Sequence, residues 1–110
     1  MKMLTPSTMK QVGRAGRGRT VWLLAFLDPA DDECMAAAEV LDKAAEVLGG
    51  AIRVGAVDCR LYANVCRAQG VQQLPSVKVL FPGGAKEYDG PKGSLRGLRE
   101  AAVGALRDSE

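Results

Sequence analysis

The amino-acid sequence predicts an α/β domain in which helices flank a central sheet of mixed strand direction. Residues Val21–Leu27 form a continuous apolar run, which is typical of a central strand covered on both faces. A helical pattern and a second strand pattern follow, and this order favours two parallel strands joined by a crossover helix. Two short strand patterns separated by Pro82–Gly84 then indicate an antiparallel hairpin at the sheet edge.

The elements on either side of the central strand follow from local signals. Residues 4–7 predict the tail of an edge strand, and residues 8–12 predict a short helix. The central strand ends at Asp28-Pro29. A helix is predicted from Asp31 to Leu48, because three acidic residues at its start suit the helix dipole and apolar residues recur at helical spacing. Gly49-Gly50 closes this helix.

The second half of the chain repeats the alternation of strands and helices. Alternating apolar residues predict a strand at 52–58, and a helix at 61–69 should end at Gly70. Strands are predicted at 76–81 and 85–88, and Ser94 is expected to cap a last helix that runs to Leu106.

Length and charge limit the classes of function. With 110 residues the chain is expected to form one domain over 1–110, whether it stands alone or is a piece of a longer precursor. A net charge of +2 is too small to indicate a nucleic-acid partner. Arg14, Arg17 and Arg19 alternate with glycines without the aromatic residues that stack on bases, so a solvated loop is predicted there, with a contact to nucleic acid or acidic lipid as the alternative. Neither a membrane span nor a secretory signal is expected within residues 1–110, so the sequence predicts either an intracellular protein or a piece of a longer precursor.

Several short motifs resemble those of one family. They are Phe26-x-x-Pro29, a cysteine that opens a helix, Val57-Asp58 and Leu74-Pro75-Ser76. Together with the element order they are similar to the thioredoxin fold, and more closely to the thioredoxin domains of the protein disulfide isomerase family of the endoplasmic reticulum. The resemblance runs from about Leu4 to Leu106 and implies that fold for nearly the whole chain.

The resemblance also implies roles for single residues. Pro75 falls at the family's cis-proline, so Leu74, Pro75 and Ser76 would bind an extended substrate; a purely structural turn is the alternative. Cys34 falls at the buried, resolving cysteine, with a small core residue as the alternative. Asp31 stands where the attacking cysteine belongs, and its carboxylate can cap a helix but cannot exchange disulfides.

Other positions depart from the family pattern in the same direction. Ala25 stands where the family has a buried acid that relays protons, and Ala56 where it has the accompanying lysine. Ala30 replaces a tryptophan before the motif, and Glu39 replaces a proline that kinks the motif helix. The acidic residues at 31–33 should disfavour the thiolate of Cys34 and make it a slow nucleophile.

Cys59 and Cys66 form a separate pair. One lies where a strand ends and the other within the next helix, so the intervening chain can fold back and bring them together. Related domains of the endoplasmic reticulum have the same pair, which favours a structural disulfide over two reduced thiols. No metal site and no cofactor are expected, because the chain has no histidine and its three cysteines do not match a zinc spacing.

Three hypotheses for the function remain from the sequence. The first is a redox-inactive or weakly active domain that holds unfolded polypeptide, or supports sister thioredoxin domains, in protein folding in the endoplasmic reticulum. The second is a monothiol disulfide-exchange enzyme that uses Cys34. The third is a cytoplasmic thioredoxin-like adaptor, in which Cys59 and Cys66 would be reduced.

Overall fold

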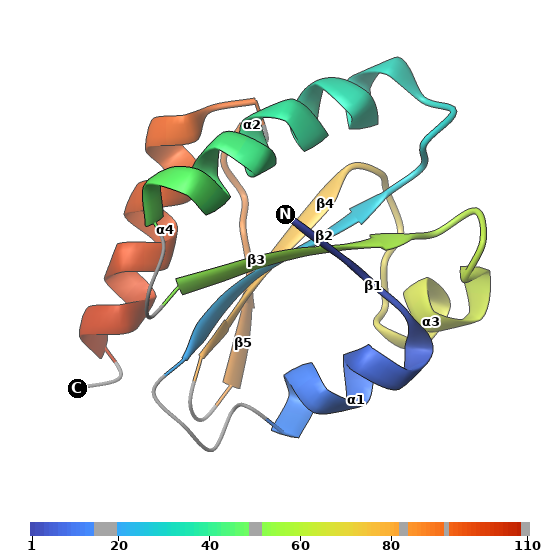
Figure 1. The fold of residues 1–110 in the computed structure, drawn as a ribbon, viewed down its shortest axis with the longest axis horizontal. Coiled ribbons are helices and arrows are strands. Elements are labelled where there is room, and N and C mark those ends of the chain that lie inside the picture. The colour runs from blue at the N-terminus through green and yellow to red at the C-terminus, as the bar shows by residue number, and fades with distance from the viewer. Residues whose placement is uncertain (15–19, 49–51, 82–83, 92, 109–110) are drawn as a thin grey trace.

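The computed structural model describes residues 1–14, 20–48, 52–81, 84–91 and 93–108, and its centre is a five-stranded sheet in the order β1-β3-β2-β4-β5 (Figure 1). The helices and strands in chain order are β1 (Lys2–Leu4), α1 (Pro6–Arg14), β2 (Val21–Leu27), α2 (Asp32–Leu48), β3 (Ile52–Asp58), α3 (Ala63–Ala68), β4 (Ser76–Phe81), β5 (Gly84–Glu87) and α4 (Leu95–Asp108).

The sheet is mixed, as the sequence predicts. β3 lies between β1 and β2 and pairs with both in parallel. β4 pairs with β2 in the antiparallel direction, and β5 forms the antiparallel hairpin with β4. Leu27 at the end of β2 lies opposite Asp58, and Phe26 lies opposite Ser76. The ends of β2 and β3 and the start of β4 therefore meet at one edge of the sheet.

Helices cover both faces of the sheet: α2 and α4 lie on one face, and α1 and α3 on the other (Figure 1). Every residue of β2 is buried, which agrees with a central strand whose two faces are both covered. Alternate side chains of β2 enter different cores. Leu23 and Ala25 join the core under α2 and α4, whereas Leu24 and Phe26 join the core that includes Leu4, Val12 and Cys66.

Several elements have different bounds from those that the sequence predicts. The edge strand expected at residues 4–7 is β1 at Lys2–Leu4, and the last helix continues past Leu106 to Asp108. The first helix begins at Pro6, not at residue 8, because Thr5 accepts a hydrogen bond from the backbone N–H of Thr8 and proline suits the first helical position. The helix predicted at 61–69 covers only Ala63–Ala68, since a turn at Asp58 occupies the residues before it. The fourth predicted strand, at 85–88, covers Gly84–Glu87.

Gly70 ends α3, as the sequence predicts. It has a φ of 74°, in the left-handed region that glycine adopts without a steric cost. The N–H of Gly70 donates to the carbonyl of Arg67, and the N–H of Val71 donates to the carbonyl of Cys66, at 3.0 and 3.1 Å. These two bonds form a Schellman motif that satisfies the last carbonyls of the helix.

Some predictions lie outside the described residues: the closing pair Gly49-Gly50, the turn at Pro82 and Gly83, and the side chains of Arg14, Arg17 and Arg19. Among the helices that the structure does describe, none combines the length and the apolar character needed to cross a bilayer.

Candidate functional site

The end of β2 forms a turn that two aspartates organise. The backbone N–H of Ala30 donates to Oδ1 of Asp28 at 2.9 Å, and the N–H of Asp31 donates to the carbonyl of Asp28 at 3.0 Å. Asp31 then caps α2, because its Oδ2 accepts from the N–H of Cys34 at 3.2 Å while its carbonyl accepts from Met35. Asp31, which stands where the resemblance implies the attacking cysteine, thus acts as the N-terminal cap of α2.

The Cys34 thiol is fully buried, with no exposed surface, and is the one unbonded cysteine among the described residues. The pKa of Cys34 is raised from 9.0 to about 11, and burial is the largest cause. A hydrogen bond with the Asp28 backbone opposes burial, whereas a hydrogen bond with the Asp31 side chain and the negative charges of Asp31 and Asp28 act in the same direction as burial. From the sequence, the acidic residues at 31–33 are the expected cause of a slow Cys34 nucleophile. The structure corrects that account, because loss of hydration is the largest cause.

The surroundings of Cys34 explain this cause. Ala25 and Ala56 lie directly opposite each other on β2 and β3, and both are fully buried in the same core as Cys34. At these two positions the resemblance implies a buried acid and a lysine in the family, whereas this chain has only the methyl side chains of Ala25 and Ala56. α2 also runs through Glu39 from Asp32 to Leu48 as one helix.

The end of β3 forms a second turn that resembles the first. Oδ1 of Asp58 accepts from the N–H groups of Arg60 and Leu61 at 2.9 and 3.0 Å, and its carbonyl accepts from Tyr62 at 2.8 Å. Cys59 and Cys66 are joined in a disulfide, with their Cα atoms 5.7 Å apart. The bond ties the end of β3 to α3.

The start of β4 completes this edge of the sheet. The Leu74-Pro75 peptide bond is cis. Leu74 is half-buried and packs against both cores, and Ser76 is 7% exposed and lies opposite Phe26 on β2. The strand register therefore places Leu74, Pro75 and Ser76 at the same edge as the turn that leads to Asp31 and Cys34. The structure brings together the residues that the resemblance singled out.

A shallow hollow lies at this edge, and sequence reasoning missed most of its residues. It is lined by Pro29, Ala30, Asp58, Arg60 and Leu61, which come from the two turns. Leu61 is 68% exposed, although it is a large apolar side chain. The signal that could have indicated this hollow is the aspartate at the end of each of two neighbouring parallel strands, because each aspartate initiates a turn there. Among the described residues, no group of three or more potential metal ligands lies close together.

The fold and this edge define a class of protein: the chain is a thioredoxin-like domain. No family model matches the chain. It is homologous to the thioredoxin domains of ERdj5 and of protein disulfide-isomerase A6.

Two sequence comparisons and one structural superposition give the extent of this similarity. The chain is 31% identical over 85 residues to DnaJ homolog subfamily C member 10 from Mus musculus, a match that covers 77% of this chain and 11% of the relative. It is 30% identical over 105 residues to protein disulfide-isomerase A6 from Mesocricetus auratus, over 94% of this chain and 24% of the relative. The crystal structure of the J-Trx1 fragment of ERdj5 superposes with a TM-score of 0.83 at 26% identity, over 96% of this chain and 51% of that one. The chain thus spans 11% and 24% of the two longer relatives and about half of the crystallised fragment.

Proposed function

We propose that this chain is a thioredoxin-like domain without dithiol activity that binds extended polypeptide at the edge formed by the Asp28–Asp31 turn, the Asp58–Tyr62 turn and the Leu74–Ser76 segment. The observation that carries the proposal is the state of Cys34. It is buried, its pKa is raised to about 11, and its motif partner is a carboxylate. Disulfide exchange needs a thiolate that attacks and a second thiol that resolves the mixed disulfide.

The same observation weighs against a monothiol enzyme. A buried thiol with a raised pKa is almost wholly protonated at neutral pH and does not reach a substrate disulfide. The other two cysteines are bonded to each other; Cys59 directly follows β3, and Cys66 lies on α3. Cys34 is therefore assigned a packing role in the core under α2, which is the usual role of an isolated buried cysteine.

The surface that remains at this edge has the features of a weak polypeptide site. Leu61 is 68% exposed, and Pro29 and Ala30 add apolar surface beside it in the hollow. Met35, in the first turns of α2, is 48% exposed. Backbone groups of an extended client would pair with the chain at Leu74–Ser76, with little preference for sequence. Such a contact buries little area, so useful strength would come from several domains that act together.

The compartment and partners of the proposal rest on the resemblance. We assign the domain to the endoplasmic reticulum, where sister thioredoxin domains of a longer protein would hold the same client. A cytoplasmic adaptor is the alternative, and it requires Cys59 and Cys66 to be reduced. Peptide mapping without reductant distinguishes the two, because the proposal expects Cys59 linked to Cys66 and Cys34 free.

Titration with an unfolded, cysteine-free polypeptide tests the site. Backbone amide shifts should change at Asp31–Cys34, Leu74–Ser76 and, on the neighbouring loop, at Gly90 and Gly93. The variant Leu61→Ser should weaken binding about fivefold, which corresponds to loss of about 1 kcal/mol of apolar contact. Val47→Ser is the matched control, because Val47 is 59% exposed at the far end of α2. Equal weakening by both variants, or no shift at this edge at millimolar client, would overturn the proposal.

A further inference from the structure

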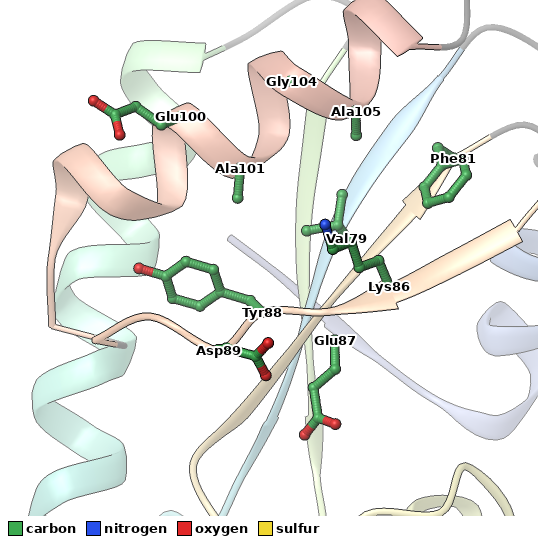
Figure 2. A pocket seen from close by; sticks show the side chains of 10 residues that line it. All are labelled: Val79, Phe81, Lys86, Glu87, Tyr88, Asp89, Glu100, Ala101, Gly104 and Ala105. Atoms are coloured by element: carbon green, nitrogen blue, oxygen red, sulfur yellow. The ribbon is translucent and has the colours of Figure 1, made fainter.

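A groove separate from the candidate site lies between the hairpin and α4 (Figure 2). Its volume is about 420 Å³. Val79, Phe81 and Tyr88 form the floor, and Ala101, Gly104 and Ala105 of α4 form the wall. The wall is low because its side chains are small; a Cβ added at Gly104 would meet no atom within 4 Å. The groove is therefore open beside β5.

β5 borders this groove and is the last strand of the sheet. Among the described residues it pairs only with β4, and all four of its residues are exposed. Its outer backbone N–H and C=O groups are thus available for a further strand. An added strand would place alternate side chains over the groove, and its backbone would supply the hydrogen bonds.

The two charged residues of β5 point to opposite faces. Lys86 lies opposite Val79 and faces α4, whereas Glu87 lies opposite Lys78 and points away from α4 (Figure 2). On β4 a base already stands opposite Glu87. Directly opposed charges of opposite sign stabilise a strand pair, and like charges destabilise it. An antiparallel strand that suits the outer edge needs a base opposite Glu87 and, as its next residue, an acid opposite Lys86.

A second copy of this chain does not meet that requirement. A two-fold axis pairs β5 with itself about a central residue. Centred on Lys86 or Glu87, it sets like charges opposite each other; centred on Ala85, it sets Lys86 opposite Gly84. None of these registers puts an opposite charge across from either residue. The charges of β5 therefore favour a different chain.

The groove adds a preference for apolar side chains on the partner strand at the two positions opposite Gly84 and Tyr88. Gly84 has no side chain, and a Cβ there would meet the ring of Phe81 at 3.5 Å, so this side of the ring is open to a partner residue. Tyr88 lies at the other end of β5 on the groove face. Large apolar residues opposite Gly84 and Tyr88 would cover both rings.

We propose that β5 and the groove beside α4 bind an extended segment of another polypeptide, added antiparallel to β5. The segment carries a base directly followed by an acid at its centre. One large apolar residue directly precedes the base, and a second large apolar residue lies two positions after the acid. This site is independent of the edge assigned under the proposed function, because it uses the outer side of β5 and the C-terminal half of α4.

Two end-blocked peptides that differ only in the order of their central charges test this proposal. Both have leucine and phenylalanine at the groove-facing positions and threonine elsewhere. The peptide with lysine before glutamate should shift the amides of Gly84–Glu87 and bind about tenfold more tightly than the exchanged peptide, because two cross-strand pairs change sign. The double variant K86E/E87K, at two exposed positions, should reverse this preference.

A second variant tests the groove itself. Ala105→Leu fills the space next to Phe81 and should weaken binding of both peptides severalfold while circular dichroism shows an unchanged fold. Equal affinity of the two peptides, no binding at millimolar peptide, or a preference that K86E/E87K leaves unchanged would overturn the proposal. Shifts confined to residues 28–34 and 74–76 would do the same and would support the other site. Dimerisation through β5 in sedimentation would identify a second copy as the occupant instead.

Discussion

The turns that follow β2 and β3 have nearly the same architecture and opposite cysteine chemistry. Each begins with an aspartate whose Oδ1 accepts the N–H two residues later at 2.9 Å, and each leads into a helix that carries a buried cysteine. After β2 the cysteine is Cys34, and its neighbour at the helix start is Asp31. After β3 it is Cys66, which is bonded to Cys59.

The difference shows what controls a thiol in this fold. Both sites have helix N–H groups and an aspartate nearby, so the local backbone does not distinguish them. What differs is the second group: beside Cys34 it is a carboxylate, which cannot form a disulfide and adds to the effect of burial in keeping the thiol protonated, whereas Cys59 bonds covalently to Cys66. Four substitutions or conditions probe this comparison.

Restoring the missing thiol should have the largest effect. The variant Asp31→Cys should reduce insulin faster than the wild-type chain, which we expect at background level. Its rate should remain about 10²–10⁴-fold below that of an intact two-cysteine domain, because Ala25 and Ala56 offer no proton transfer. The double variant D31C/C34S is the control and should lose the gain. Full activity in D31C, or wild-type activity that C34S abolishes, would contradict the comparison.

High pH should destabilise the domain through Cys34. Its pKa of about 11 in the folded state exceeds the ordinary value of 9.0, so the folded state keeps a proton that the unfolded state releases. The stabilisation is complete below pH 9 and is lost as the pH rises to about 11, by about 2–3 kcal/mol. Urea unfolding at several pH values measures it. Cys34→Ala should lack this component of the decline, and an identical decline in both proteins would refute the assignment.

Opening the disulfide should lower the free energy of unfolding by somewhat less than raising the pH does. Cys59 and Cys66 are seven positions apart, and closing so short a loop contributes about 2 kcal/mol on a chain-entropy model. The double variant C59A/C66A should lose that amount in the free energy of unfolding. Reductant should destabilise the wild-type chain similarly and leave C59A/C66A unchanged. If reductant destabilises both proteins equally, the bond between these two residues does not carry the effect.

Removal of one aspartate side chain, either the α2 cap Asp31 or the turn residue Asp58, should have the smallest effect on stability. Asp31→Ala and Asp58→Ala should each lower the free energy of unfolding by about 1 kcal/mol, since each leaves backbone N–H groups without their side-chain acceptor. Only Asp31→Ala should also lower the pKa of Cys34, because it removes a hydrogen bond to the thiol and a negative charge. Thiol titration by ultraviolet absorbance separates them. A lower Cys34 pKa in D58A would show that the two turns are coupled.

Sequence patterns predicted most of the fold because they depend on local chemistry. The apolar run at Val21–Leu27 and the helix that ends at Leu48 have the bounds that periodicity indicates. Boundaries failed where side chains compete for backbone groups: Asp58 accepts the N–H groups of Arg60 and Leu61, and so delays the start of α3.

The candidate site was only partly predictable. Asp31 and Cys34 are recognisable from the motif, and the cap follows from the residue type at the start of a helix. The hollow beside Leu61 and the groove beside α4 join segments distant in sequence, so no local pattern indicates them. The strand register that aligns Leu27 with Asp58 and Phe26 with Ser76 creates the edge.

The sequence by itself determined the order of elements and the loss of the dithiol motif, because periodicity and the identity of residue 31 are local properties of the chain. Only the tertiary structure decided that burial dominates the pKa of Cys34 and that Ala25 faces Ala56 across two strands. It alone also showed that β5 leaves an open edge next to a groove. Hydration and strand pairing depend on which distant segments pack together, and a linear pattern does not contain that information.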